Sequence, residues 1–415
     1  MRKNILTIAL LATTTLAFAD KPIPDNETVY PLLGGKKEIS SLADVEKLGL
    51  VNGATTIDLW SGHYWPHFQG SLAVRYRDSS FMSLMVAQVQ YDKFKDLKDK
   101  LPLYTYSGRE NELSPSEKYD LVVGDEAMGL TKYSWELGDK ANTFGKVPTW
   151  RGICDGWSSA TQMMPRPVRS VTLPTPSGVM VTFYPEDIKA LGSLLYARAQ
   201  ENVIFLGKRC RNQVLGLFTG ACDGTNPGAF HKALVNRVGN LKKTFIADVS
   251  SGSEVWNYPV KNYSTSYYNV FSDEESVGFK DSMEIFTKKN RFHKSGRRHK
   301  ETYAIVGVKT VVNYTNMRVA NLLETDSTVQ DEVLQKVYYY DLELDYRFNV
   351  LGGEWYGDTM PDFIWAPNDR TYPLSDEEEY GKPKTAAQIR EAAKAASKKG
   401  QPLSLIVSKL FEAAK

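Results

Sequence analysis

Hydrophobic residues in the first half of the chain recur mostly with a helical period. Pro185 precedes an apolar face formed by Ile188, Leu191, Leu195 and Ala199, a pattern typical of an amphipathic helix. The proline suits the first turn of a helix, where its missing N–H costs nothing. The sequence therefore predicts a helix that begins at Pro185.

Capping residues mark three other helix starts. Residues 114–117 combine a serine cap, a proline in the first turn and a glutamate three positions after the cap. The segment 226–239 begins with Asn-Pro, carries an apolar face and ends in a glycine. A short helix is also predicted near residues 41–47.

Strand patterns are concentrated in the second half, where β-branched and aromatic residues form several runs. The candidate strands are residues 179–184, 245–249, 255–258, 303–314 and 337–344. Helices and strands are interspersed early and strands cluster late. We therefore expect an α+β fold with a strand-rich C-terminal half.

The N-terminus has the pattern of an export signal. Arg2 and Lys3 precede a short apolar stretch at residues 5–16, and Ala-Phe-Ala at residues 17–19 forms an A-x-A cleavage site before Asp20. The stretch is shorter than the ~20 residues that span a bilayer, and no later segment is apolar enough to do so. The sequence predicts a signal peptide and a periplasmic or secreted protein without a transmembrane segment.

Changes in composition divide the rest of the chain. The expected divisions are a signal peptide (1–19), an N-terminal segment (20–100), a catalytic core (101–275), a strand-rich C-terminal part (276–370) and a charged, Ala/Lys-rich tail (371–415). We expect the tail to be helical and to lie outside the core. Residues 288–300 hold seven Lys or Arg in thirteen positions, which is typical of a solvated loop and also suits contact with an acidic surface.

Charge and composition exclude several classes of protein. Among the 415 residues, 51 Lys and Arg stand against 49 Asp and Glu, which argues against a nucleic-acid-binding protein. Removal of residues 1–19 takes away two positive charges and leaves 49 of each sign. Five scattered histidines do not suggest a His-rich metal protein, and no EF-hand loop is present. Any Ca²⁺ site would be assembled from distant loops, so the metal ligands are unknown from the sequence.

Three cysteines in an exported protein leave one unpaired. Cys210 and Cys222 lie twelve positions apart, across a segment with two glycines, and are the expected disulfide. Cys154 is then the free thiol. Two hypotheses remain open for it at this point: a buried structural thiol and a reactive one.

The residues around Cys154 favour a reactive thiol. Gly152 and Gly156 flank it, and small residues follow, as at the start of a helix. A helix N-terminus stabilises a thiolate, and its free N–H groups can hold an oxyanion. A thiolate nucleophile also needs a base and a group that orients the base. His231 in a predicted helix and Asp248 in the following strand are the candidates, because a helix and its next strand can bring them together.

The other histidines are weaker candidates for the base. His63 and His67 lie in an aromatic stretch, and His293 and His299 lie in the basic segment. The sequence therefore predicts a Cys154–His231–Asp248 site.

Several segments resemble the secreted transglutaminase elicitor family, which is known from oomycetes and has bacterial relatives. The similar segments are 114–120, 150–157, 184–191, 226–231, 254–260, 352–356 and 361–365. The resemblance implies a protein-glutamine γ-glutamyltransferase that joins glutamine- and lysine-bearing proteins and needs no cofactor for the chemistry. It also implies a Cys-His-Asp triad like that of papain-type proteases, on a scaffold that need not be papain-like.

This mechanism makes specific demands on the site. A thiolate–imidazolium pair is expected to lower the pKa of Cys154 to ~3–4, and a donor besides the Cys154 N–H is expected to hold the oxyanion. Trp135, Trp150 and Trp157 are the candidates for this donor or for the cleft wall. The sequence leaves alternatives open: a deamidase or papain-type cysteine protease with the same triad, or a non-catalytic secreted surface-binding module.

Overall fold

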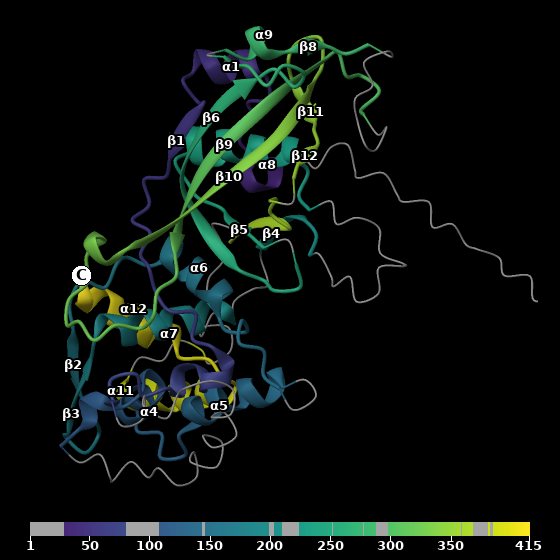
Figure 1. The fold of residues 1–415 in the computed structure, drawn as a ribbon. Helices are drawn as coiled ribbons and strands as arrows, with labels where there is room; N and C mark the ends of the chain where they lie inside the picture. The colour runs from purple at the N-terminus through teal and green to yellow at the C-terminus, as the bar shows by residue number, and fades with distance from the viewer. Residues whose placement is uncertain are drawn as a thin grey trace, which may run out of the picture.

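The computed structural model of the protein describes residues 29–79, 108–142, 146–198, 203–209, 224–250, 252–276, 278–287, 298–357, 359–367, 381 and 385–415. A sheet-rich part and a helix-rich part lie end to end, with helix α6 between them (Figure 1).

The helices that begin at Pro115, Pro185 and Pro227 start where the sequence predicts. The helices of the described residues are α1 (Leu42–Lys47), α4 (Pro115–Val123), α5 (Gly129–Ala141), α6 (Cys154–Met163), α7 (Pro185–Ala197), α8 (Pro227–Ala233), α9 (Phe279–Ser282), α11 (Ala386–Lys398) and α12 (Ser404–Ala414). The Ser114 hydroxyl accepts a hydrogen bond from the Glu117 N–H, and the Glu117 carboxylate accepts one from the Ser114 N–H, as the capping pattern predicts. The α8 helix continues into the π-helical turn η7 (Leu234–Asn240).

Each of the five predicted runs overlaps a strand, and eight further strands among the described residues were not predicted. The strands are β1 (Asn52–Ala54), β2 (Val171–Pro174), β3 (Met180–Phe183), β4 (Val203–Gly207), β5 (Ile246–Asp248), β6 (Asn257–Tyr268), β7 (Glu275–Ser276), β8 (Glu284–Ile285), β9 (Ala304–Asn316), β10 (Glu332–Leu344), β11 (Val350–Gly352), β12 (Trp355–Tyr356) and β13 (Phe363–Pro367). Mixed helices and strands with a strand-rich C-terminal half confirm the predicted α+β class.

One large antiparallel sheet holds most of these strands. Its main order is β11-β10-β9-β6-β5-β13-β4, and β2 and β3 form a separate hairpin. Long strands β6, β9 and β10 run through the upper part (Figure 1). The short strands β5, β13 and β4 extend the sheet from β6. Side chains of β4, β6 and β13 line the same cavity as the start of α6.

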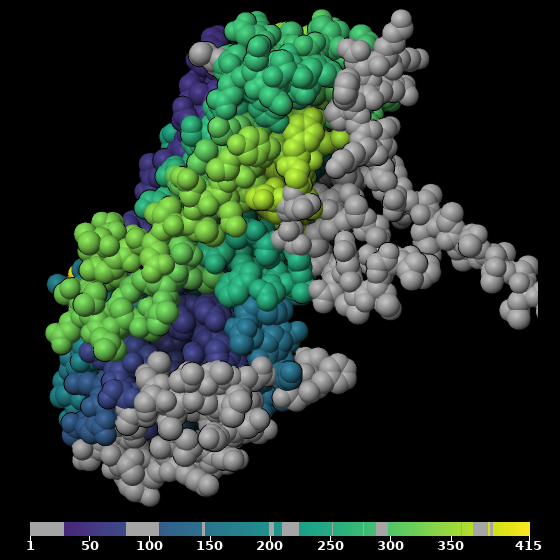
Figure 2. Space-filling view, in the orientation of Figure 1, coloured from purple at the N-terminus to yellow at the C-terminus, as the bar shows by residue number. Residues whose placement is uncertain are grey.

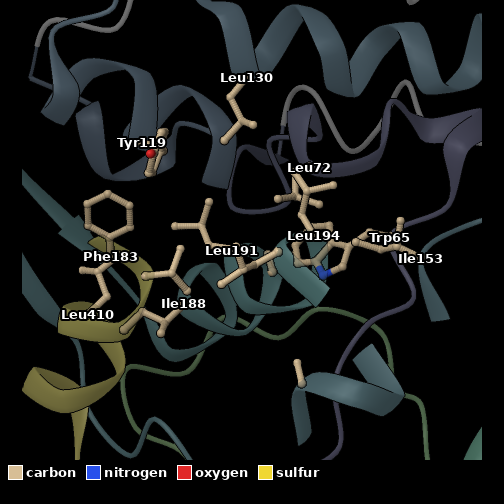
Figure 3. Packing of buried hydrophobic residues seen from close by; sticks show 14 of the residues in the cluster. Trp65, Leu72, Tyr119, Leu130, Ile153, Phe183, Ile188, Leu191, Leu194 and Leu410 are labelled. Atoms are coloured by element: carbon tan, nitrogen blue, oxygen red, sulfur yellow. The ribbon is translucent and has the colours of Figure 1, made fainter. Parts of the chain in front are cut away.

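Two hydrophobic cores lie on either side of this junction. The first core joins α4–α7, α11 and α12, and Figure 3 shows Ile188, Leu191 and Leu194 of α7 at its centre. The second core joins the sheet to α8 and α1. Phe230 of α8 contacts the ring of Tyr338 with 5.2 Å between the ring centroids.

The position of α6 is fixed by close contact with α7. A Cβ atom at Gly156 would lie 2.0 Å from the backbone oxygen of Ser193, so only glycine allows this approach. The α7 helix is itself anchored by Asp187, which forms a buried ion pair of 2.6 Å with Lys118. Because these contacts are buried, the start of α6 is held on a rigid base.

The C-terminal segment is part of the core, so the prediction that it lies outside the core is wrong. Leu403, Val407, Leu410 and Phe411 are almost fully buried in the first core. These positions are spaced as one helical stripe, which the Ala/Lys-rich composition of the segment obscures. The helical prediction for residues 385–415 is confirmed by α11 and α12.

The segment between β9 and β10 connects the two parts. It descends over the helical part, in light green in Figure 2. Asp326 in this segment forms buried ion pairs with Arg166, Lys189 and Arg318 at 2.9–3.0 Å. These ion pairs fix the orientation of the helical part against the sheet.

The predictions for the basic segment and for the signal peptide concern residues that the structure describes only in part. Arg298 of the basic segment is buried and pairs with Asp341 and Glu343, so this residue is not solvated. The remainder of that segment up to residue 297 and the predicted signal peptide lie outside the described residues. Within the described ranges, no helix is long and apolar enough to cross a membrane.

Candidate functional site

Cys154 lies at the N-terminus of α6, in the wall of a cavity of about 410 Å³. Both parts of the protein contribute to this cavity. Its lining consists of His67, Trp150, Arg151, Gly152, Cys154, Asp155, Val203, Phe205, Arg209, Val255, Asn257, Phe363 and Trp365. The Cys154 side chain is supported by the helix and shares the cavity with side chains from β4, β6 and β13.

The backbone before Cys154 is held by the segment 64–67. The Ile153 N–H donates to the Tyr64 carbonyl at 2.7 Å, and the His67 N–H donates to the Arg151 carbonyl at 2.9 Å. A Cβ atom at Gly152 would lie 2.3 Å from the Tyr64 carbonyl oxygen. The glycine before the cysteine is therefore required by this close backbone contact.

The sulfur of Cys154 has two polar neighbours on the strand side. The thiol donates to the Val255 carbonyl at 3.8 Å, and Asn257 Nδ2 donates to the sulfur at 3.5 Å. Trp365 Nε1 donates to the other end of the same amide, Asn257 Oδ1, at 2.8 Å. Cys154 is a free cysteine.

The protonation state of the thiol differs from the expectation of a low pKa. Burial raises the pKa of the Cys154 thiol to about 12, the charge of Asp155 adds to this rise, and hydrogen bonds from Asn257 oppose it. The resting group is therefore a neutral thiol, and the thiolate has to form by proton transfer during attack.

Asp248 lies beside Asn257 at the end of β5. The two residues are directly opposite each other in the antiparallel β5–β6 pair, where Cβ atoms on one face are about 4.5–5.5 Å apart. One carboxylate oxygen, Oδ1, accepts hydrogen bonds from Trp256 N–H at 2.9 Å and from the Ser250 hydroxyl at 2.8 Å. The other oxygen, Oδ2, is buried without a hydrogen-bond partner.

Burial raises the pKa of Asp248 to about 6, against hydrogen bonds from Trp256 and Ser250 that lower it. The charge of Asp248 in turn raises the pKa of Cys154, so the two groups interact. A carboxyl group that titrates near neutral pH suits proton transfer.

His231 does not contact Cys154 or Asp248 in any hydrogen bond or ion pair of the described residues. It lies on α8, which packs against β10 and β11, and its Nδ1 is 2.9 Å from the Tyr340 hydroxyl. Its Nε2 is buried without a partner, and burial lowers its pKa to about 4. Ala247 faces the second core with α8, whereas Asp248 alternates to the other side of β5. The structure thus brings Asp248 near Cys154 but places His231 in the second core.

A different histidine lines the cavity. His67 is half-buried there, and its pKa is lowered to about 4 by burial and by the nearby charge of Arg151. His63 is buried with its Nδ1 3.1 Å from the Arg318 carbonyl, His299 Nδ1 accepts from the Glu301 N–H, and His293 lies outside the described residues.

The three candidate tryptophans have different positions. Trp150 lines the cavity, with the Arg151 and Arg209 guanidinium groups each 5.5 Å from its ring centroid. Trp157 is fully buried, and its Nε1 donates to the Trp60 carbonyl at 3.3 Å. Trp135 on α5 packs in the first core over Gly70. Of these three tryptophans, only Trp150 lines the cavity that Cys154 also lines.

The predicted Cys210–Cys222 disulfide lies outside the described residues. Among the residues that are described, no group of three or more His, Cys, Asp or Glu side chains is arranged to hold a metal ion.

The sequence analysis missed Asn257 and Trp365. Both lie in segments that carry the family resemblance, 254–260 and 361–365, so a signal was available. The connection from Trp365 through Asn257 to Cys154 was not visible, because Asn257 and Trp365 are 108 positions apart and Cys154 is 103 positions before Asn257.

Comparisons with known proteins agree with this architecture. The fold is similar to the crystal structure of the GP42 transglutaminase from Phytophthora sojae, with a TM-score of 0.59 and 22% sequence identity, over 94% of this chain and 97% of that chain. No curated protein matches the chain. A family model described as "Transglutaminase elicitor" matches residues 38–375. This match spans most of the chain and confirms the resemblance seen in the sequence: the chain belongs to the transglutaminase elicitor family.

Proposed function

We propose that the protein is a protein-glutamine γ-glutamyltransferase with Cys154 as its nucleophile. The observation that carries the proposal is the position of Cys154 at the start of α6, in a cavity wall and with an N–H donor of Asn257 directed at its sulfur. Membership of a family named for transglutaminases supports the reaction class.

In the first step, the sulfur attacks the γ-amide carbon of a glutamine side chain. The S–H bond breaks, the S–C bond forms, and Asp248 takes up the thiol proton. Asp248 suits this role because its Oδ2 is buried and unpartnered and its pKa is raised to about 6 by burial. The N–H groups at the start of α6 stabilise the oxyanion.

In the second step, the tetrahedral intermediate collapses and the C–N bond breaks. Asp248 returns the proton to the leaving nitrogen, which departs as ammonia and leaves a thioester on Cys154. A lysine or another primary amine then attacks the thioester, and Asp248 takes its proton and passes it back to the sulfur. The acid–base role expected of His231 stays a prediction that no described contact supports.

Incubation with casein and labelled cadaverine tests the reaction class. We expect ammonia release and covalent attachment of cadaverine to glutamine side chains in equal amounts. Ammonia without attached amine would instead identify a deamidase, and cleaved peptide bonds would identify a protease. Absence of all three products from a folded protein would favour the surface-binding module.

The charge of the cavity predicts a preference among glutamine substrates. Arg151 and Arg209 line the cavity, and within the described ranges neither forms an ion pair with a carboxylate. Asp155 also lines it, and its negative charge offsets only one of the two guanidinium charges. We therefore expect peptides with Asp or Glu beside the glutamine to have a kcat/KM about fivefold above peptides with Lys there, at low salt.

This preference is measured with paired peptides that differ only at the flanking position. It should weaken in 0.5 M salt and in Arg209→Met. Lys208→Met, at the neighbouring position outside the cavity lining, is the matched control. Equal kcat/KM values for both peptides at low salt would contradict a role of the two guanidinium groups in substrate selection.

Glutamine- and lysine-bearing proteins are the partners that this chemistry requires. We propose export to the periplasm or the exterior as its setting, on the basis of the N-terminal sequence. The reaction as written uses no metal at any step. We name no calcium ligand, and calcium dependence is tested directly by adding Ca²⁺ or a chelator to the cadaverine assay.

A further inference from the structure

Two hydrogen bonds in series lead from β13 to the sulfur of Cys154. Trp365 Nε1–H donates to Asn257 Oδ1 at 2.8 Å, and Asn257 Nδ2–H donates to Cys154 Sγ at 3.5 Å. The three residues are only 4%, 4% and 6% exposed. Water therefore competes little for these bonds, and their strength is greater than at the surface.

The orientation of the Asn257 amide follows from the chemistry of the indole. An indole N–H is only a donor, so the amide atom that faces Trp365 is the oxygen. The NH₂ end then faces the sulfur. A reversed amide would place two donors against each other at Trp365 and an oxygen lone pair against the sulfur, which would disfavour a negative charge there.

Asn257 offers the sulfur a second donor. Its backbone N–H as well as its side-chain N–H favours the thiolate, and both oppose the rise in pKa that burial causes at Cys154. The Val249 N–H donates to the Trp256 carbonyl, so Asp248 and Asn257 form a non-hydrogen-bonded pair of the antiparallel β5–β6 ladder. The backbone N–H of Asn257 therefore points away from β5. One residue thus directs two N–H groups to the nucleophile.

We propose that Asn257 is a catalytic residue that stabilises the Cys154 thiolate, and that Trp365 is the positioning residue that keeps its amide turned toward the sulfur. This inference rests on the proposed role of Cys154 as nucleophile. In the step concerned, the S–H bond breaks, its electron pair stays on the sulfur and Asp248 takes the proton. The two N–H groups of Asn257 then hold the negative charge.

Other charged and titratable groups also surround the sulfur, and the test has to separate their effects from that of Asn257. They are Asp155 on α6, Asp248 on β5, Tyr258 on β6, Tyr64 in the preceding segment, and His67, Arg151 and Arg209 in the cavity lining. None of them is changed by the substitutions below, so their contribution is common to all variants.

The rate of alkylation of Cys154 by iodoacetamide provides the readout. The rate is followed between pH 7 and 9 by the mass of the Cys154 peptide, where it is proportional to the thiolate fraction. Trp365→Phe keeps an aromatic ring but removes the indole N–H, and we expect alkylation at least about tenfold slower, equal to a thiol pKa raised by about one unit. Alkylation of Cys154 in the Asn257→Ala variant should be slowed at least as much.

Trp355→Phe is the matched control. The Trp355 Nε1–H also donates to an oxygen at 2.7 Å, but that oxygen is the Thr225 carbonyl, and Trp355 does not line the cavity. We expect its alkylation rate to stay within about twofold of wild type. Thermal unfolding of every variant verifies that the compared proteins are folded.

A double variant separates positioning from a mere change in cavity shape. If Trp365 acts through Asn257, then Trp365→Phe adds no further slowing in an Asn257→Ala background. Wild-type alkylation in a folded Trp365→Phe, or full additivity of the two changes, would overturn the proposal. If Trp365→Phe does not fold, Asn257→Ala alone decides, and wild-type alkylation there overturns the role of Asn257. The cadaverine assay tests the transferase itself, so the two proposals can fail separately.

Discussion

Cys154→Ser is expected to lower the rate of cadaverine incorporation by at least about 10³-fold, because a neutral hydroxyl is a far weaker nucleophile than a thiolate. The substitution is nearly isosteric, and a hydroxyl can keep the bonds to the Val255 carbonyl and to Asn257. The free energy of unfolding should therefore change by less than about 1 kcal/mol. Ammonia release and amine attachment are measured together, beside a thermal unfolding curve.

Ser158→Ala is the control for this substitution. Ser158 lies one turn further along α6, where its hydroxyl donates to the Asp155 carbonyl at 2.9 Å, outside the cavity lining. It should keep full turnover. A Cys154→Ser protein that unfolds would identify a structural thiol, and one that retains turnover would remove Cys154 from the mechanism.

Local sequence signals predicted the elements better than their assembly. The caps at Ser114 and Asn226 depend on residues within three positions, and both form as expected. The neighbours of each strand in the sheet cannot be read locally, because the pairing is between distant segments. The docking of α12 depends likewise on a hydrophobic surface to which the distant helix α7 contributes.

In the candidate site, too, local features were predicted and contacts between distant segments were not. The helix start at Cys154 was predicted from its neighbours and is confirmed, since a glycine-flanked helix start is a local property. His231 was placed correctly in a helix, but its hydrogen-bond partner there is the Tyr340 hydroxyl and not Asp248. Every residue of α8 is buried, so the sequence pattern does not reveal which face of the helix contacts which neighbour.

Asp248→Asn is the prediction that separates the two assignments of the base. Asp248 is the group that the proposed mechanism assigns to take up the thiol proton, so we expect turnover about 10²- to 10⁴-fold lower without its carboxylate. Asn retains an oxygen for the bonds from Trp256 and Ser250. His231→Gln should keep turnover within a few-fold, and it should lose some stability through the bond to Tyr340.

The stability of Asp248→Asn should change in the opposite direction from its activity. The pKa of Asp248 is raised by burial from 3.8 to about 6, so the folded protein binds this proton more tightly than the unfolded chain does. The stability of the wild type therefore falls as the pH rises from about 4 to about 6, and then levels off. Above about pH 6, the buried charge of Asp248 lowers the free energy of unfolding by about 3 kcal/mol.

Asparagine carries no charge, so this loss should be absent from the variant. We expect equal free energies of unfolding at pH 4 and a variant up to about 3 kcal/mol more stable at pH 7.5. Denaturant unfolding at both pH values measures the difference. A raised stability together with lost turnover would mean that the protein keeps a destabilising buried carboxylate beside Cys154 for its chemistry. If instead a folded His231→Gln loses turnover and Asp248→Asn keeps it, the base is His231 and the assignment to Asp248 is wrong.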